Sequence, residues 1–142
     1  MRLPDRNKKP NPASFHLLIV DDDPEMRNLL SEELEDEGYR VTVAKNGLDV
    51  LSEIPFTSYD MIITDWKLPL RDGIEILQSV REIHPGLPVI LITAFGDAKV
   101  RKKVERAGGV YLQKPFSMEA FKHMVQSLLP QRKTSRLPRP IP

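Results

Sequence analysis

The chain has 142 residues, of which 40% are hydrophobic and 29% charged, a length and composition typical of one globular domain with its own core. It contains no cysteine, which excludes disulfides and thiolate metal sites. No apolar run approaches the roughly 20 residues needed to cross a bilayer, and the polar N-terminus does not resemble a signal peptide. We therefore expect a cytoplasmic protein with no membrane segment.

The net charge of +1 conceals an uneven distribution. Residues 1–14 contain four basic side chains and one acid, and residues 130–142 contain four basic side chains and no acid. Residues 15–129 therefore hold 13 basic and 19 acidic residues, and seven of the 13 prolines lie in the two ends. We predict a flexible basic N-terminal extension over 1–14, a folded domain over 15–129, and a proline-rich basic tail or truncated linker over 130–142.

The first half of the domain predicts two strands, each followed by a helix. Residues 17–20 form a buried apolar run that ends at three consecutive acids, and Pro24 then suits the first position of a helix capped by Asp23. Gly38 ends that helix, residues 40–44 alternate like a strand, and residues 47–54 form a short helix. The side chains expected to face the core from these two helices are Met26, Leu29, Leu30, Leu34, Leu48 and Leu51.

The second half continues the same alternation. Strands are predicted over 61–64, 89–92 and 110–112, and they are followed in turn by Asp65, Thr93 and the pair Gln113-Lys114. Helices are predicted over 98–107 and after the capping residue Ser117, and a third begins after the Asp72-Gly73 turn. The apolar stripe of that third helix is expected to consist of Ile74, Leu77, Val80 and Ile83.

Strands that alternate with helices predict an α/β protein with a parallel sheet covered on both faces. Right-handed crossovers favour a doubly wound, flavodoxin-like sheet of five strands in the order 2-1-3-4-5. In that order the first and third strands are neighbours. The polar residues that follow four of the strands would then share one edge of the sheet: Asp21, Asp22, Asp65, Thr93 and Lys114.

The chemistry of this set indicates phosphoryl transfer. Oxygen ligands without histidine or cysteine select a hard cation such as Mg²⁺, and one carboxylate beside that ion can act as a nucleophile on phosphorus. Asp65, from the central strand, is the best placed nucleophile, while Asp21 and Asp22 would hold the metal. Taken singly, each residue has a plainer interpretation, such as a polar turn or a solvated lysine. The combination at strand ends favours the functional one.

The order and spacing of these motifs resemble the receiver domain of two-component response regulators. The motifs that carry the resemblance, which spans about 15–129, are Val20-Asp21-Asp22, Asp65 with Pro69 and Asp72-Gly73, Thr93-Ala94, and Lys114-Pro115-Phe116. It implies that Asp65 accepts a phosphoryl group from a sensor histidine kinase or a phosphotransfer protein. It also implies a stoichiometric phosphoacceptor that assists its own phosphorylation and dephosphorylation, and therefore no enzyme in the ordinary sense.

The resemblance also assigns roles around Asp65. Mg²⁺ would be bound by Asp22 and Asp65 with Asp21 alongside, and Lys67 would add its backbone carbonyl. Thr93 and Lys114 would contact the phosphoryl group, and Thr93 with Tyr111 would form the switch, the ring turning inward on activation. The bond between Lys114 and Pro115 is expected to be cis.

Two features depart from the family pattern. The approach to the last strand, Ala107-Gly108-Gly109-Val110-Tyr111, is one residue shorter than usual, so the preceding helix is expected to shift or unwind slightly. Lys67 and Phe95 occupy variable positions, two residues past Asp65 and Thr93, that influence phosphate lifetime in the family.

The output is expected to be protein binding. The basic residues of helix 98–107 form the expected output face, for a downstream partner or a second copy: Lys99, Lys102, Lys103 and Arg106. The chain is either a stand-alone receiver or the N-terminal receiver of a longer DNA-binding regulator, and a phosphorylation-independent scaffold is a further alternative. A dehalogenase-like phosphatase would need an acid at position 67, and the acidic domain argues against direct nucleic-acid binding.

Overall fold

The computed structural model describes residues 14–94 and 98–130. Nearly all of the predicted extension 1–14 and tail 130–142 lies outside these ranges, as does Phe95. No helix within the described ranges is both long and apolar enough to cross a membrane. The elements are β1 (His16–Val20), α1 (Pro24–Asp36), β2 (Arg40–Ala44), α2 (Gly47–Glu53), the 3₁₀ turn η1 (Phe56–Ser58), β3 (Met61–Asp65), α3 (Gly73–Ile83), β4 (Val89–Thr93), α4 (Ala98–Arg106), β5 (Val110–Gln113) and α5 (Met118–Leu128).

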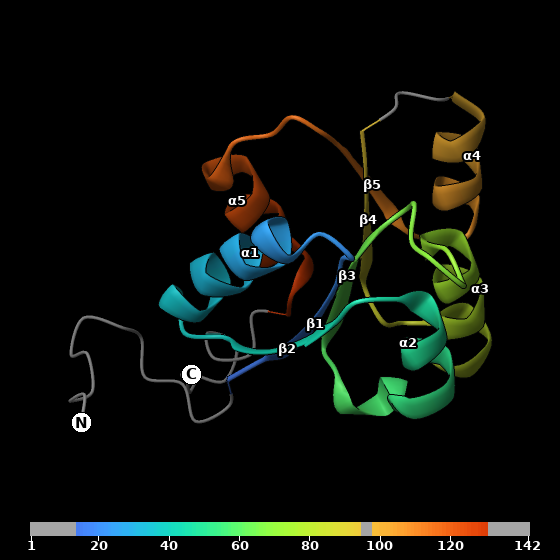
Figure 1. The fold of residues 1–142 in the computed structure, drawn as a ribbon, viewed down its shortest axis with the longest axis horizontal. Helices are drawn as coiled ribbons and strands as arrows, with labels where there is room; N and C mark the ends of the chain where they lie inside the picture. The colour runs from blue at the N-terminus through green and yellow to red at the C-terminus, as the bar shows by residue number, and fades with distance from the viewer. Residues whose placement is uncertain (1–13, 95–97, 131–142) are drawn as a thin grey trace, which may run out of the picture.

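The five strands form one parallel sheet in the order β2-β1-β3-β4-β5, which confirms the predicted topology. In Figure 1, α1 and α5 cover one face of the sheet and α2, α3 and α4 cover the other. Alternate residues of each strand serve the two cores: Leu17 and Ile19 pack under α1 and α5, whereas Leu18 and Val20 pack under the other three helices. The three central strands β1, β3 and β4 are therefore buried on both faces, as their continuous apolar sequences require, whereas β2 and β5 at the edges are only partly buried.

Local signals set the ends of several helices. Asp23 caps α1 by accepting from Glu25 N–H at 3.0 Å, and Ser117 caps α5. The C-terminus of α4 closes with a Schellman motif, because Gly109 N–H donates to Val104 O and Gly108 N–H to Glu105 O. Gly108 has a φ of +79°, which a residue without Cβ adopts at little cost. This tight ending lets α4 stop at Arg106, ahead of a short approach to β5.

Three leucine or isoleucine side chains that the helical stripes placed in the core are exposed instead. Leu29 is 42%, Leu48 40% and Ile83 62% exposed. The physical reason is that α1 packs through Leu30 and Leu34, α2 through Val50, and α3 through Ile76, Leu77 and Val80, so each packed face is rotated from the predicted stripe. The predictions for these three residues were wrong.

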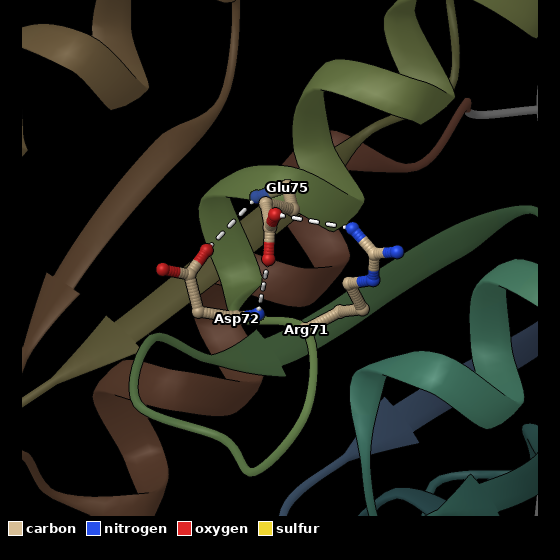
Figure 2. Close-up of polar contacts among 3 residues, drawn as sticks. All are labelled: Arg71, Asp72 and Glu75. Carbon is tan, nitrogen blue, oxygen red and sulfur yellow. Dashed lines mark hydrogen bonds and ion pairs between the residues drawn. The ribbon is translucent and has the colours of Figure 1, made fainter.

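The first turn of α3 is held by a complete capping box (Figure 2). Glu75 N–H donates to the carboxylate of Asp72, and Asp72 N–H donates to the carboxylate of Glu75, both at 3.0 Å. Arg71 Nη1 lies 3.5 Å from the other Glu75 oxygen. These contacts order the end of the loop that follows β3.

Replacing Asp72 with alanine is expected to destabilise the fold by about 1 kcal/mol, the usual cost of losing an N-cap side chain. Urea unfolding of the variant measures the loss. Glu75→Gln is the matched control, because its amide oxygen still accepts from Asp72 N–H and its expected loss is below about 0.5 kcal/mol. Equal losses in the two variants would show that the Asp72 cap contributes nothing specific.

Candidate functional site

Three carboxylates meet where β1 and β3 end. Oxygen atoms of Asp21, Asp22 and Asp65 all lie within 4.8 Å of one another. β1 and β3 are hydrogen-bonded neighbours, with Val20 opposite Thr64, so the residues that follow are brought together by the strand order itself. The structure thus assembles the predicted acidic cluster at the carboxyl edge of the sheet, where ligands bind in open α/β folds.

The turn between β1 and α1 fixes Asp21. Its N–H donates to Ala44 O at 3.1 Å, its Oδ1 accepts from Asp23 N–H at 3.0 Å, and its carbonyl accepts from Arg27 Nη1 at 2.9 Å. Asp21 is only 2% exposed, whereas Asp22 beside it is exposed. The pair therefore offers one buried, oriented carboxylate and one that solvent or a cation can reach.

Asp65 is positioned by close main-chain packing. Trp66 N–H continues the ladder to Ile92 O at 2.8 Å, and Gly73 N–H returns to Trp66 O at 2.9 Å. A Cβ on Gly73 would lie 2.5 Å from the carbonyl oxygen of Asp65, so only glycine lets α3 begin this close to β3. The loop between them also turns tightly at Leu70, which has a φ of 73°.

Lys114 and Thr93 complete this edge of the sheet. Lys114 Nζ lies 3.6 Å from Asp65 Oδ1, and Lys114 N–H donates to Thr93 O at 2.8 Å. Thr93 is 2% exposed and lies opposite Gln113 on β5. The bond between Lys114 and Pro115 is cis, as predicted. The polar residues that follow β1, β3, β4 and β5 therefore lie along one edge of the sheet.

The electrostatics of the cluster favour a bound cation. Burial, and after it the charge of the neighbouring Asp21, raise the pKa of Asp65 to about 6 against the opposing effect of Lys114. Burial likewise raises the pKa of Asp21, against a backbone hydrogen bond from Asp23 and the charge of Lys114. Two partly desolvated carboxylates that repel each other are stabilised by a positive ion. Three oxygen donors with no histidine or cysteine among them fit a hard divalent cation.

The remaining predicted site residues lie in the loop after β3, on β5 and on α4. Lys67 is exposed, and its ammonium lies 5.5 Å from the centroid of the Trp66 ring. Tyr111 is half-buried on β5. The four basic residues of the predicted output face, Lys99, Lys102, Lys103 and Arg106, are all exposed on α4.

Two arginines that contact predicted site residues were missed by sequence reasoning. Arg27 braces the backbone of Asp21, and Arg101 places its guanidinium carbon 5.6 Å from the centroid of the Tyr111 ring. From sequence alone, an arginine on an amphipathic helix is expected to face solvent. Only the position of Arg27, one helical turn after the three acids, indicated that it could contact them.

Comparisons with known proteins agree with this geometry. The profile of the response regulator receiver domain family matches residues 17–126. The sporulation initiation phosphotransferase F of Bacillus subtilis is 35% identical over 115 residues, which cover 80% of this chain and 93% of that protein. The transcriptional regulatory protein GlrR of Escherichia coli is 32% identical over 117 residues, and the matched region is 82% of this chain but only 26% of that longer protein.

A solved structure shares the fold as well. A CheY-like response regulator receiver domain protein from Methanospirillum hungatei superposes with a TM-score of 0.79 and 26% identity, covering 87% of this chain and 99% of that one. The strand order, the acidic cluster, the sequence profile and this superposition all lead to the same conclusion. The chain belongs to the response regulator receiver domain family.

Proposed function

We propose that this chain is a phosphoacceptor that takes one phosphoryl group onto Asp65 from a phosphohistidine of a sensor histidine kinase or phosphotransfer protein. The observation that carries the proposal is the position of the Asp65 carboxylate, which lies beside Asp21 and Asp22 and 3.6 Å from the ammonium of Lys114. A nucleophile, a set of oxygen ligands and a cation for the incoming phosphoryl oxygens are thus within reach of one another.

In the transfer, a carboxylate oxygen of Asp65 attacks phosphorus and a new O–P bond forms. The P–N bond to the donor imidazole breaks, and its electron pair stays on the nitrogen. Asp65 must be ionised to attack, and a pKa of about 6 leaves it mainly ionised above neutrality. Lys114 is placed to offset the charge of the phosphoryl oxygens, and the hydroxyl of Thr93, at the end of β4, would donate a hydrogen bond to one of those oxygens.

The residues present fit a magnesium ion. Asp21, Asp22 and Asp65 would hold it with their side chains, and Lys67 would add its backbone carbonyl. Bound Mg²⁺ would supply positive charge that reduces repulsion between the carboxylates and the incoming phosphoryl group. Asp21, buried and oriented by Arg27 and Asp23, would keep its place in that ligand set without rearrangement.

The proposed outcome of phosphorylation is a change of binding surface and not turnover of a substrate. Thr93 and Tyr111 would respond to the phosphoryl group, and the exposed cations of α4 would contact a downstream protein or a second copy of the chain. The match to GlrR supports a related form of the proposal, in which this chain is the receiver of a longer transcriptional regulator. Both forms require the same chemistry at Asp65.

Incubation with acetyl phosphate and Mg²⁺ tests the proposal by intact mass. We expect one phosphoryl group per chain, none when EDTA removes the metal, and trapping of the adduct at Asp65 by borohydride reduction, which cleaves acyl phosphates. Beryllofluoride, which mimics the phosphoryl group, should change the fluorescence of Trp66 next to Asp65. A protein that gains no mass and binds no beryllofluoride under any of these conditions would refute the phosphoacceptor function.

A further inference from the structure

The contact that suggests a further role lies where α4 meets β5. The guanidinium of Arg101 lies over the ring of Tyr111, with 5.6 Å between the guanidinium carbon and the ring centroid. This is within the range of a cation–π interaction. Arg101 Nε also donates to Glu105 Oε2 at 3.1 Å, one helical turn further along α4. Glu105 thus holds the arginine on the side of α4 that adjoins Tyr111.

The helix that carries Arg101 is itself anchored. The guanidinium of Arg81, from α3, donates to the carbonyls of Ala107 and Gly108, which follow α4 directly. Tyr111 is half-buried and packs against the core beneath α2, α3 and α4. The Arg101 side chain is therefore presented to the ring from a helix with a fixed end, and the contact resists movement of Tyr111 relative to α4.

We propose that Arg101 is a positioning residue that stabilises the resting position of Tyr111 and thereby opposes occupation of the phosphoryl site. The inference rests on the proposed function, in which the ring turns inward when the phosphoryl group binds. An inward turn takes the ring away from the guanidinium, so only the resting state keeps the contact. The contact therefore lowers the free energy of the resting state relative to the state with the ring turned inward. A ligand that binds the inward state must supply this additional free energy.

The same contact links the ring to the charge on α4. Arg101 stands among the exposed cations Lys99, Lys102, Lys103 and Arg106. An acidic protein segment that binds this face would compete with Glu105 and Tyr111 for the guanidinium. Because coupling between two sites is reciprocal, such a segment would favour the phosphoryl-bound state, and that state would bind the segment more tightly.

A beryllofluoride titration of the whole chain in saturating Mg²⁺ tests the proposal. Trp66 is the single tryptophan of the chain and adjoins Asp65, so its fluorescence reports occupancy. For Arg101→Ala we expect binding about two- to five-fold tighter than for the wild type, as expected from loss of an exposed cation–π contact. Arg101→Lys, which keeps the charge, should restore most of the wild-type affinity. Glu105→Gln should give a smaller tightening.

The matched control is Arg40→Ala, which removes the same charge from an exposed residue at the start of β2, at the opposite edge of the sheet from Asp65, and should leave the affinity unchanged. A double-mutant cycle tests the pair directly: in a protein that already carries Tyr111→Leu, Arg101→Ala should not change the affinity for beryllofluoride. In the ligand-free protein, the Tyr111 ring proton resonances should shift on Arg101→Ala but not on Arg40→Ala. Equal affinities for the Arg101 and Arg40 variants would overturn this role for Arg101 alone. A wild-type chain that binds no beryllofluoride would overturn the phosphoacceptor function and this role with it.

Discussion

Asp65→Asn is expected to abolish phosphoryl uptake and, in metal-free buffer at pH 7.5, to raise the free energy of unfolding by about 1–3 kcal/mol. The first effect follows because an amide is not a nucleophile toward phosphorus. The second follows because the fold disfavours the ionised carboxylate, whose pKa rises from 3.8 to about 6. A shift of about two units corresponds to roughly 3 kcal/mol. Only 13% of the Asp65 side chain is exposed, so screening by solvent reduces this free energy only slightly.

The sign of the pH dependence follows from proton uptake. Between about pH 4 and 6 the folded protein binds a proton at Asp65 that the unfolded chain has already released, so wild-type stability falls as the pH rises through this window. The asparagine variant lacks this titration. Its advantage should therefore be largest above pH 6 and should disappear near pH 4.

Urea unfolding in EDTA at pH 7.5 and pH 4.5 measures both the gain and its pH dependence. Asp36→Asn, which neutralises an exposed carboxylate on α1 outside the cluster, is the matched control and should change stability by less than about 0.5 kcal/mol. Added Mg²⁺ should stabilise the wild type more than the Asp65 variant. No gain over Asp36→Asn at pH 7.5 would mean that the cluster carries no electrostatic cost.

The parts of this fold that sequence reasoning captured are those encoded by continuous segments. The central strands of this parallel sheet are buried on both faces, so Leu17-Leu18-Ile19-Val20 and Val89-Ile90-Leu91-Ile92 are uninterrupted apolar runs that stand out from the amphipathic helices. Handedness and adjacency then left few strand orders, and the correct order placed the residues after the strands on one edge. The acidic cluster was predictable because it is a property of strand ends.

Helix orientation was less predictable. A stripe such as Ile74, Leu77, Val80 and Ile83 defines a face, but the partner helices and the sheet decide which part of that face is covered. In α3 the covered side is centred on Ile76, Leu77 and Val80, and Ile83 lies beyond its edge. The buried face is hardest to predict for short helices: α2 buries Val50 and leaves Leu48 exposed.

Long-range polar contacts gave no sequence signal at all. Arg81 lies within an amphipathic helix, where an arginine is expected to be a solvated charge. Two of the carbonyls that accept its hydrogen bonds lie 26 and 27 positions further along the chain. The Arg101 contact to Tyr111 likewise depends on how α4 lies against β5. Such contacts are set by tertiary packing and become visible only when the elements are assembled.

Arg81→Ala is expected to destabilise the protein by about 2–3 kcal/mol, a large fraction of the stability of a small domain. The guanidinium donates to three carbonyls: Leu87 O and Ala107 O at 2.7 Å, and Gly108 O at 3.0 Å. Hydrogen bonds from a charged donor contribute more than neutral ones, and truncation removes that donor from two partly buried carbonyls, those of Leu87 and Ala107. Burial lowers the pKa of the arginine, in agreement with a guanidinium held among backbone groups.

The local loss of stability should be largest at the C-terminal end of α4, because Arg81 connects this end to α3 and to the residues that precede β4. Amide hydrogen exchange should therefore accelerate for residues 107–110 in Arg81→Ala beyond what the global loss of stability explains. Arg81→Lys should recover only part of the stability, since a single ammonium lacks the planar array of donors that reaches three carbonyls. The control is Arg71→Ala, which removes one exposed ion pair to Glu75 at 3.5 Å and should cost less than about 0.5 kcal/mol. If Arg81→Ala costs no more than Arg71→Ala, the three carbonyls are satisfied by solvent, and α4 owes its fixed end to the Schellman motif at Gly108 alone.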